Sequence, residues 1–474
     1  MKNAWVAELV DARDLKSLGE NLCTSSILVP GTKKKIKGFG LLTKTLFLNQ
    51  SKADNSFMDK IQIIGGRKLR GEVSISGAKN AALPLIASSI LVKGKTRFSN
   101  VPNLMDIKSI RLLLEDLGAT CESQDRYLEV DGSSINKIEA QYDLVRKMRA
   151  SILVLGPLVA RFGHAKVSLP GGCAIGARPV NMHLSGLKAL GAAISIEHGY
   201  IEAKADRLIG NEIYFDMPTV TGTENLMMAA TLAKGTSVLR NAAREPEIVA
   251  LAEALNLMGA RVSGAGSAII TIEGVKNLSS ADIKIIPDRI ETGTFMVAVA
   301  AAGGDVLIKG CEPDHIGGII NKLKATGATI ETFTDSIRVI GNTPVQSVDI
   351  KTLPYPGFPT DMQAQFMTLM TIADKNSMIH ESIFENRFVH ANELLRMGAD
   401  ISISSGNIAM VRGVKKLQGA QVMASDLRAS ASLVIAGLVA EGTTVISRVY
   451  HMDRGYEAIE NKFSLLGANI ERIK

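Results

Sequence analysis

The chain has 474 residues, of which 46% are hydrophobic and 21% are charged, a balance that excludes a largely disordered protein. The sequence has no apolar run approaching about 18 residues, which argues against a membrane span. Residues 1–57 contain nine basic and five acidic residues, so the other 417 residues carry a net charge of only +3. That small excess argues against a nucleic-acid partner, and the length predicts two or three domains.

The cysteines exclude two further classes of protein. Their spacing is wide and irregular and fits neither a disulfide framework nor a zinc site. They are Cys23, Cys121, Cys173 and Cys311. We therefore expect a reduced, cytoplasmic protein without a metal centre.

Residues 1–57 differ from the rest of the chain. They contain the basic run Lys33–Lys35 and no sustained period, and they lack the order of regions typical of a signal peptide. At Met58 the string MDKIQIIGG begins, which is typical of a strand. We expect translation to start at Met58 and residues 1–57 to be a non-native or disordered extension.

From Met58 onward, a leucine-rich amphipathic stretch that ends in Gly-Ala occurs six times at intervals of 68 to 73 residues. A glycine directly after a helix is typical of a left-handed helix end, and a β-branched residue that follows indicates a strand. Each unit is therefore predicted to be a helix, a glycine stop and a strand. The glycines are Gly118, Gly191, Gly259, Gly327, Gly398 and Gly467.

A second helix recurs in step with the first and is apolar on nearly all sides, as in AALPLIASSILV and RASASLVIAGLVA. Such helices are typical of a domain interior. Six units of about 70 residues predict an α/β (α+β) protein of two domains, each made of three repeats whose buried helices are surrounded by sheets.

Polar and charged residues stand at the predicted starts of these buried helices. A helix N-terminus attracts anions, and basic side chains there favour a phosphate or carboxylate ligand. If the repeats of a domain are related by rotation, the helix starts converge on one face. The residues are Lys79 and Asn80, Arg149, Thr223 and Glu224, Glu291, Asp361 and Arg428.

Nine strings that span residues 77–457 carry a resemblance to a known family. They are GAKNAALP, MRAS, LPGGCAIGARPV, NAAREPEI, PDRIETGT, FPTDMQAQF, FENRF, QVMASDLRASASLV and DRGYE. Together they closely resemble the UDP-N-acetylglucosamine enolpyruvyl transferases, over essentially all of residues 58–474. The resemblance implies the enolpyruvyl-transferase fold, with residues 79–287 as an N-terminal domain and residues 58–78 plus 288–474 as a C-terminal domain.

The resemblance also implies the activity, which is transfer of the enolpyruvyl group of phosphoenolpyruvate to the 3-hydroxyl of UDP-N-acetylglucosamine, with release of phosphate. This is the first committed step of peptidoglycan precursor synthesis, and it needs no cofactor. It implies that phosphoenolpyruvate is bound by Lys79, Asn80, Arg178, Arg387, Arg428 and Arg454.

The resemblance assigns catalysis to Cys173, Asp361 and Lys79. A cysteine in a Gly-Gly-Cys loop beside an arginine is favoured as a thiolate, because nearby cations stabilise that form. The resemblance makes Cys173 the general acid and the position that fosfomycin alkylates in the family, and it makes Asp361 the base near the sugar hydroxyl.

For the nucleotide sugar, the resemblance implicates residues in six separate stretches of the chain. They are Asn80, Arg149, Arg178, Pro179, Val180, Asn181, Met182, Thr219, Val220, Thr360, Asp361 and Ile383. Three positions depart from the common family pattern and leave the uracil and diphosphate contacts open. They are Asn181, where Asp is frequent, Met217, where some members have Lys, and Thr221, where Gly is frequent.

Two alternatives remain at this stage. The chain could be a 5-enolpyruvylshikimate-3-phosphate synthase, which has the same fold and the same enolpyruvyl donor, although the loop with Cys173 favours the sugar enzyme. It could also be a catalytically silent paralogue that binds a nucleotide sugar as a regulator. Histidines such as His183 are expected to be structural.

Overall fold

The computed structural model describes residues 59–170, 180–404 and 406–474. The predictions for residues 1–57 and for a start at Met58 lie outside the described residues, as do those for Cys173, Arg178 and Pro179. Two hydrophobic cores lie within the described chain. One contains buried residues from Ala78 to Ile285, and the other joins residues between Ile61 and Ile75 to residues between Ile290 and Ile470.

Six four-stranded sheets make up the strand structure of the described residues. All six have one order, in which the first two strands are parallel and the third and fourth each run antiparallel to their neighbour. The first sheet has, in spatial order, the strands β14 (Asp282–Lys284), β3 (Lys95–Ser99), β5 (Tyr127–Asp131) and β4 (Thr120–Gln124). The second has β6 (Glu139–Ala140), β7 (His164–Ser168), β9 (Tyr200–Lys204) and β8 (Ala193–Glu197). The third has β10 (Glu212–Tyr214), β11 (Thr236–Arg240), β13 (Ile269–Glu273) and β12 (Arg261–Ser263).

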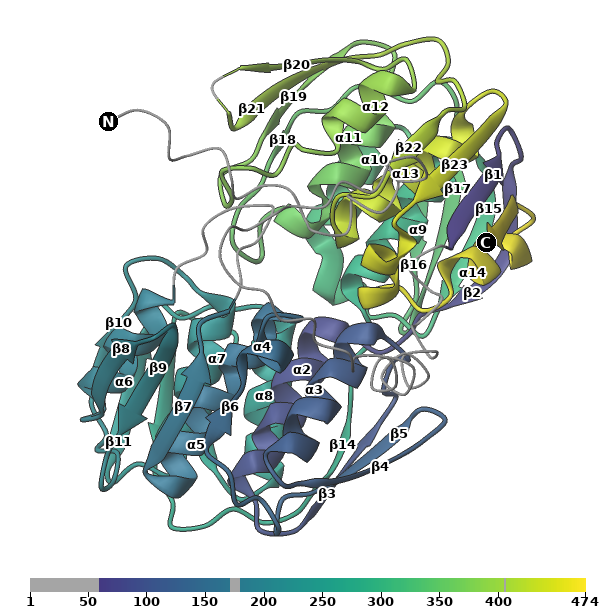
Figure 1. Ribbon diagram of the computed structural model, residues 1–474. Coiled ribbons are helices and arrows are strands. Elements are labelled where there is room, and N and C mark those ends of the chain that lie inside the picture. The colour runs from purple at the N-terminus through teal and green to yellow at the C-terminus, as the bar shows by residue number, and fades with distance from the viewer. Residues whose placement is uncertain (1–58, 171–179, 405) are drawn as a thin grey trace, which may run out of the picture. The chain divides into compact units, whose positions relative to one another are not determined.

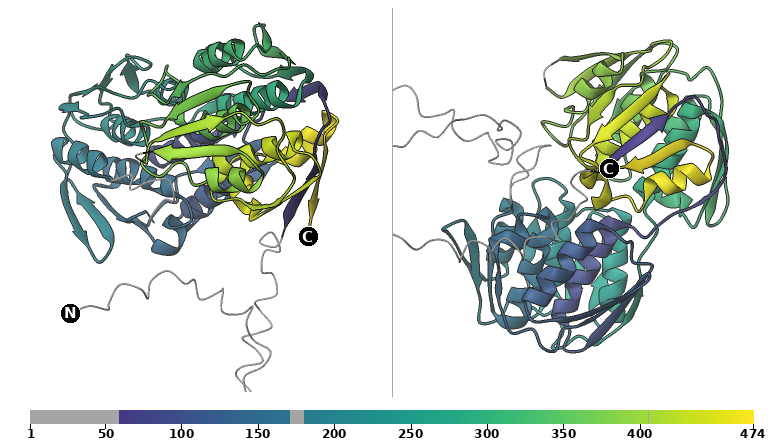
Figure 2. Two further views of the ribbon diagram at one scale, coloured as in Figure 1. Left: turned by 90° about the horizontal axis from the view of Figure 1, so that it is seen from above. Right: turned by 45° about the vertical axis from the view of Figure 1, so that its right-hand side comes forward.

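The other three sheets repeat this order and recruit the first two strands of the described chain. The fourth sheet has the strands β2 (Leu69–Ser74), β15 (Gly304–Lys309), β17 (Ser336–Gly341) and β16 (Thr329–Thr332). The fifth has β18 (Ile350–Lys351), β19 (Asn376–His380), β21 (Ile408–Arg412) and β20 (Asp400–Ser404). The sixth has β22 (Gln421–Met423), β23 (Thr443–Ser447), β1 (Lys60–Ile64) and β24 (Asn469–Ile473). Figures 1 and 2 show the purple strand β1 between the yellow strands β23 and β24, where Ile61 pairs with Ile446 and Arg472. Segments from opposite ends of the described chain therefore complete one sheet.

The six helix, glycine and strand units are confirmed. The helices are α3 (Met105–Asp116), α6 (Asn181–Ala189), α8 (Pro246–Leu257), α10 (Gly317–Ala325), α12 (Ala391–Arg396) and α14 (Ile459–Leu465). Each is followed by its predicted glycine in the left-handed region, with φ between 87° and 105°. The main-chain N–H of Ala119, directly after Gly118, donates to the carbonyl of Leu114 at 2.9 Å, a bond typical of a Schellman helix end. The glycine therefore turns each helix back into a strand of the sheet.

The six apolar helices are also confirmed, and their side chains are almost entirely buried. They are α2 (Lys79–Ser88), continued by η3 (Ser89–Leu91); η4 (Arg149–Val154) with α5 (Leu155–Phe162); α7 (Val220–Ala230); α9 (Arg289–Ala302); η6 (Thr360–Met362) with α11 (Gln363–Met370); and α13 (Leu427–Val439). In α9, every residue from Ile290 to Ala301 is buried. Three short helices complete the described structure: α4 (Tyr142–Val145), η5 (Pro313–Ile316) and η7 (Val449–Arg454).

Two predicted helix starts were wrong, by three residues and by two residues. Helix α7 begins at Val220 rather than at Thr223, because the hydroxyl of Thr219 accepts the N–H of Gly222 and caps the helix. Helix α9 begins at Arg289 rather than at Glu291, because the carboxylate of Asp288 accepts the N–H groups of Ile290 and Glu291. Both capping residues belong to the types preferred at a helix N-cap.

The two ends of α10 allow a test of the glycine stops. We expect Gly327→Ala to lower the free energy of unfolding by about 1–2 kcal/mol, because Gly327 has φ +90° and an L-residue is strained there. Gly317→Ala is the matched control, since Gly317 opens the same helix with φ −51° and a Cβ there would meet open space. Denaturant unfolding of both variants should show a loss for Gly327→Ala alone. Equal effects of the two substitutions would contradict the assignment.

Candidate active site

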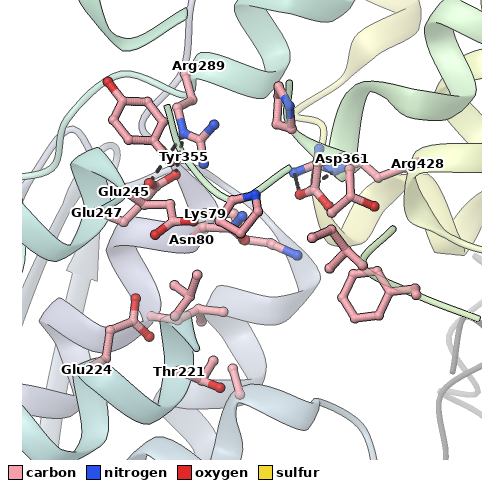
Figure 3. A pocket seen from close by; sticks show the side chains of 18 of the residues that line it. Lys79, Asn80, Thr221, Glu224, Glu245, Glu247, Arg289, Tyr355, Asp361 and Arg428 are labelled. Carbon is pink, nitrogen blue, oxygen red and sulfur yellow. Dashed lines mark hydrogen bonds and ion pairs between the residues drawn. The ribbon is translucent and has the colours of Figure 1, made fainter. Parts of the chain in front are cut away.

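The starts of all six buried helices meet at one cavity of about 330 Å³. The six helices contribute Lys79 from α2, Ala150 from η4, Val220 from α7, Arg289 from α9, Asp361 from η6 and Arg428 from α13. Figure 3 shows Asp361 and Arg428 on one side of the pocket, Lys79 and Asn80 near its middle, and a group of acidic side chains around Arg289. The predicted convergence of helix starts is therefore confirmed, in a pocket of a size typical of ligand sites.

Two aspartates at helix N-caps hold the basic residues of the pocket in place. Asp426 accepts the N–H groups of Arg428 and Ala429 at 2.9 and 3.0 Å and so begins α13. Asp288, which caps α9, also accepts the main-chain N–H of Lys79 at 3.4 Å. The starts of α2 and α9 are thereby tied to each other.

Two buried arginines hold the carboxylate of Asp361. Nη2 of Arg387 donates to Oδ1 at 2.8 Å, and Nη2 and Nε of Arg428 donate to Oδ2 at 3.0 and 3.2 Å. Both arginine side chains are only 5% exposed. Arg387 also donates from Nη1 to the hydroxyl of Thr360 at 2.9 Å. Two guanidinium groups from separate segments therefore bind one carboxylate.

These arginines decide the charge of Asp361. Burial by itself raises the pKa of Asp361, but the positive charges of Arg428 and Arg387 outweigh burial and hold that pKa well below its usual range. Asp361 is therefore ionised at neutral pH.

A second cluster of charges lies beside the first. Nε of Arg454 donates to Oδ1 of Asp106 at 2.9 Å, and Nζ of Lys79 lies 3.5 Å from Oδ2 of the same carboxylate. Burial, together with the charges of Arg428 and Arg454, lowers the pKa of Lys79, while Asp106 and Asp361 raise it. The positive charge of the Lys79 side chain is therefore supported by its acidic neighbours Asp106 and Asp361.

The other side of the pocket is acidic. Nε of Arg289 donates to both oxygens of Glu247, at 3.0 and 3.3 Å, and the Arg289 guanidinium lies 5.7 Å from the centre of the Tyr355 ring. Burial raises the pKa of Glu245, and it raises the pKa of Glu224 well above the usual range for a glutamate. Oε1 of Glu224 has no hydrogen-bond partner among the described residues.

The structure brings most of the residues predicted to bind phosphoenolpyruvate, and some of those predicted for the nucleotide sugar, to this pocket. Among the residues predicted from the sequence, the lining residues are Lys79, Asn80, Val220, Glu224, Thr360, Asp361, Ile383, Arg387, Arg428 and Arg454. The remaining described residues predicted for the nucleotide sugar lie outside its lining. They are Arg149, Val180, Asn181, Met182 and Thr219. Glu291, predicted at a helix start, does not line the pocket either, because its carboxylate binds Lys462 at 2.6 Å and the N–H of Ser76 at 2.7 Å.

His183 has the structural environment that we expected. It is 3% exposed, and burial together with Arg149 lowers its pKa to about 4, so the ring is neutral. Its ring nitrogens lie 3.0 Å from the amide nitrogen of Asn225 and 3.3 Å from the hydroxyl of Thr221. The unusual threonine at position 221 is thus tied to a buried histidine at the pocket edge.

Sequence reasoning assigned no role to several charged residues of the site. Glu245, Glu247 and Arg289 belong to the strings NAAREPEI and PDRIETGT, so a signal for them was present. Asp106 lies in none of the nine strings, and its only signal is an acidic residue in the first turn of a predicted helix.

Three further features of the described residues concern metal binding, membrane-spanning helices and the cysteine thiols. Residues 59–170, 180–404 and 406–474 contain no group of three or more His, Cys, Asp or Glu side chains that could hold a metal ion. The helices in these ranges are too short or too polar to cross a membrane. Burial raises the pKa of the Cys121 and Cys311 thiols to about 12 and about 11, so both stay protonated at neutral pH.

Comparisons with known proteins agree with this architecture. Residues 63–463 match the family model of EPSP synthase (3-phosphoshikimate 1-carboxyvinyltransferase). A UDP-N-acetylglucosamine 1-carboxyvinyltransferase from Desulforapulum autotrophicum is 74% identical over 417 residues, which are 88% of this chain and 100% of that protein. One from Desulfosudis oleivorans is 62% identical over 416 residues, again 88% of this chain and 100% of that protein.

Solved structures agree on the fold. The enolpyruvyl transferase NikO from Streptomyces tendae has a TM-score of 0.79 at 24% identity, over 88% of this chain and 99% of that one. An EPSP synthase from Acinetobacter baumannii has a TM-score of 0.68 at 18% identity, over 88% of this chain and 100% of that one. The predicted enolpyruvyl-transferase fold is confirmed.

Glu224 provides a pH test of the acidic side. Burial raises the pKa of Glu224 in the folded protein, so above pH ~4.3 the folded chain keeps a proton that the unfolded chain loses. Between pH ~4.3 and the pKa of the folded protein, the free energy of unfolding therefore falls as pH rises, by about 1.4 kcal/mol per pH unit. We expect Glu224→Gln to abolish this loss, so that its melting temperature exceeds that of the wild type more at pH 8 than at pH 5. Glu253→Gln, at an exposed position of α8, is the control. A constant difference across pH would contradict the assignment.

Proposed function

The chain belongs to the family of the UDP-N-acetylglucosamine 1-carboxyvinyltransferases, and we propose that it transfers the enolpyruvyl group of phosphoenolpyruvate to the 3-hydroxyl of UDP-N-acetylglucosamine with release of phosphate. In this proposal the reaction takes place in the cytoplasm and begins the synthesis of peptidoglycan precursors. The proposed domains are residues 79–287 and residues 58–78 plus 288–474, in agreement with the two hydrophobic cores.

The observation that carries the proposal is the set of hydrogen bonds from Arg387 and Arg428 to the carboxylate of Asp361. A pair of buried guanidinium groups that binds one carboxylate in this way suits the carboxylate of phosphoenolpyruvate. The Arg428 guanidinium also lies 5.4 Å from the centre of the Tyr456 ring, so it is fixed from a second side. In the proposed complex, the substrate carboxylate takes the place that Asp361 occupies in the structure.

The same exchange prepares Asp361 for proton transfer. Once the arginines bind the substrate carboxylate, Asp361 loses the charges that hold its pKa far below the usual range. Its pKa then rises toward the ordinary value, and the carboxylate becomes a stronger base. The proposed role of Asp361 is to accept the proton of the sugar 3-hydroxyl.

The phosphate of phosphoenolpyruvate is proposed to lie against Lys79 and Arg454, which share the carboxylate of Asp106, and against Arg178. Asn80 lines the pocket directly after Lys79, at the positively polarised start of α2. These groups stabilise the phosphate as it leaves.

The proposed reaction is an addition followed by an elimination. The oxygen of the sugar 3-hydroxyl bonds to C2 of phosphoenolpyruvate, its proton passes to Asp361, and C3 gains a proton from the Cys173 thiol. The Cys173 thiolate then takes a proton back from C3, and phosphate leaves C2 with the proton held by Asp361, which forms the enol ether. Lys79 supports the charge on the phosphate in both steps.

The nucleotide sugar is proposed to extend from Asp361 toward the start of α7. Thr360, Ile383 and Val220 line the pocket between these points, and Thr219 caps α7 next to them. The further proposed contacts are Arg149, Arg178, Pro179, Val180, Asn181 and Met182.

A phosphate-release assay separates the candidate functions. We expect turnover of phosphoenolpyruvate with UDP-N-acetylglucosamine and none with shikimate 3-phosphate, and we expect fosfomycin to abolish turnover through Cys173. Turnover with shikimate 3-phosphate alone would favour the synthase alternative. Binding of UDP-N-acetylglucosamine without turnover would favour a silent regulator.

Asp361→Asn tests the base. An amide cannot accept the hydroxyl proton, so we expect kcat to fall by about 10²–10⁴-fold. The KM for phosphoenolpyruvate should not rise, because the arginine pair no longer holds an internal carboxylate. Asp305→Asn, which removes an exposed ion pair with Arg338, is the control. A kcat for Asp361→Asn close to that of the control would exclude Asp361 as the base.

A further inference from the structure

Asp106 is a buried acid in the first turn of α3, and its side chain is only 4% exposed. An ionised carboxylate at this depth is costly unless it is paired, and the start of a helix offers it partial compensation. The proposed reaction gives Asp106 no proton to carry and no substrate to touch.

Its partners are two cations of the proposed phosphate site. Arg454 binds it in a two-point contact, from Nε to Oδ1 at 2.9 Å and from Nη2 to Oδ2 at 3.4 Å. Lys79 approaches Oδ2 from α2, with Nζ at 3.5 Å. Asp106 and Arg454 are 348 residues apart, so this carboxylate joins the two cations across distant parts of the sequence.

The charge state of Lys79 depends on several neighbouring charges, and Asp106 is one of them. Lys79 faces the positive charges of Arg428 from α13 and Arg454 from η7, and the negative charges of Asp106 and Asp361. Asp288, at the start of α9, accepts its main-chain N–H. In the proposed reaction Asp361 gives up its arginines to the substrate carboxylate and is neutralised by the proton of the sugar hydroxyl. Asp106 is then the remaining carboxylate of these two that supports the charge on Lys79.

We propose that Asp106 is a positioning residue, which holds the Lys79 ammonium and the Arg454 guanidinium side by side as a preformed site for the phosphate of phosphoenolpyruvate. This inference rests on the proposed function. Asp106 binds Arg454 through Nε and Nη2, and it thereby fixes the plane of the guanidinium. Lys79 has three donors, so its ion pair with Asp106 leaves donors for a phosphate in the cavity that it lines.

Asp106→Asn and Asp106→Glu test the proposal in steady-state assays of phosphate release. We expect Asp106→Asn to lower kcat/KM for phosphoenolpyruvate by about tenfold or more, through KM, while the KM for UDP-N-acetylglucosamine changes little. The alkaline limb of the kcat/KM profile should move to lower pH, by about one unit, because Lys79 loses the nearest charge that keeps it protonated. Asp106→Glu should restore the limb.

Arg126→Gln is the matched control. It removes an ion pair to Glu457, at 3.7 Å, which joins the same two regions of the chain outside the pocket lining. If Asp106→Asn only lowers the melting temperature as Arg126→Gln does, with an unchanged KM and pH profile, the proposal is overturned. A lower KM would also overturn it, since Asp106 would then compete with the phosphate. Absence of turnover in the wild type would instead refute the proposed function.

Discussion

The structure of the pocket depends on the need to pair buried positive charge with negative charge. Four cations that line it, Lys79, Arg387, Arg428 and Arg454, share two carboxylates, those of Asp361 and Asp106. Unpaired, a buried guanidinium or ammonium would be expensive to desolvate. The two aspartates therefore make it possible for the folded protein to keep these four cations in the cavity before any anion arrives, and each carboxylate pairs with two of them.

This pairing gives the two acids different parts in the proposed reaction. Asp361 is 26% exposed and lines the cavity, so a substrate carboxylate can displace it from Arg387 and Arg428. Asp106 is 4% exposed and belongs to α3, so it stays with its cations. In the proposed reaction, the carboxylate of Asp361 is therefore exchanged for that of the substrate and becomes a stronger base, while the carboxylate of Asp106 stays in place.

The sequence predicted the parts of this arrangement that follow from local rules. A helix that must turn back sharply needs a left-handed residue, and this is why glycines at 118, 191, 259, 327, 398 and 467 indicated the repeat. The six apolar helices followed from their composition, and most of the lining cations followed from family motifs. The exact helix starts did not, because Thr219 and Asp288 act as caps one turn earlier. Asp106 could not be assigned, since its contact with Arg454 spans 348 residues and depends on how the repeats pack. Glu247 and Arg289 lie in family motifs, but their pairing across 42 residues also depends on that packing.

The sixfold repeat explains why the cavity is cationic on one side and acidic on the other. Every repeat delivers a helix start with the same positive polarity, so the side chains at these starts decide the local charge. Where they are Lys79 and Arg428, the site suits a small dianion. Where Glu224 lies in the first turns of α7, burial and the neighbouring Glu247 and Glu245 raise its pKa, and a neutral carboxyl group suits an uncharged polar ligand such as a sugar. A single backbone plan thus presents two chemically different surfaces within one cavity, one suited to a small anion and the other to an uncharged polar group.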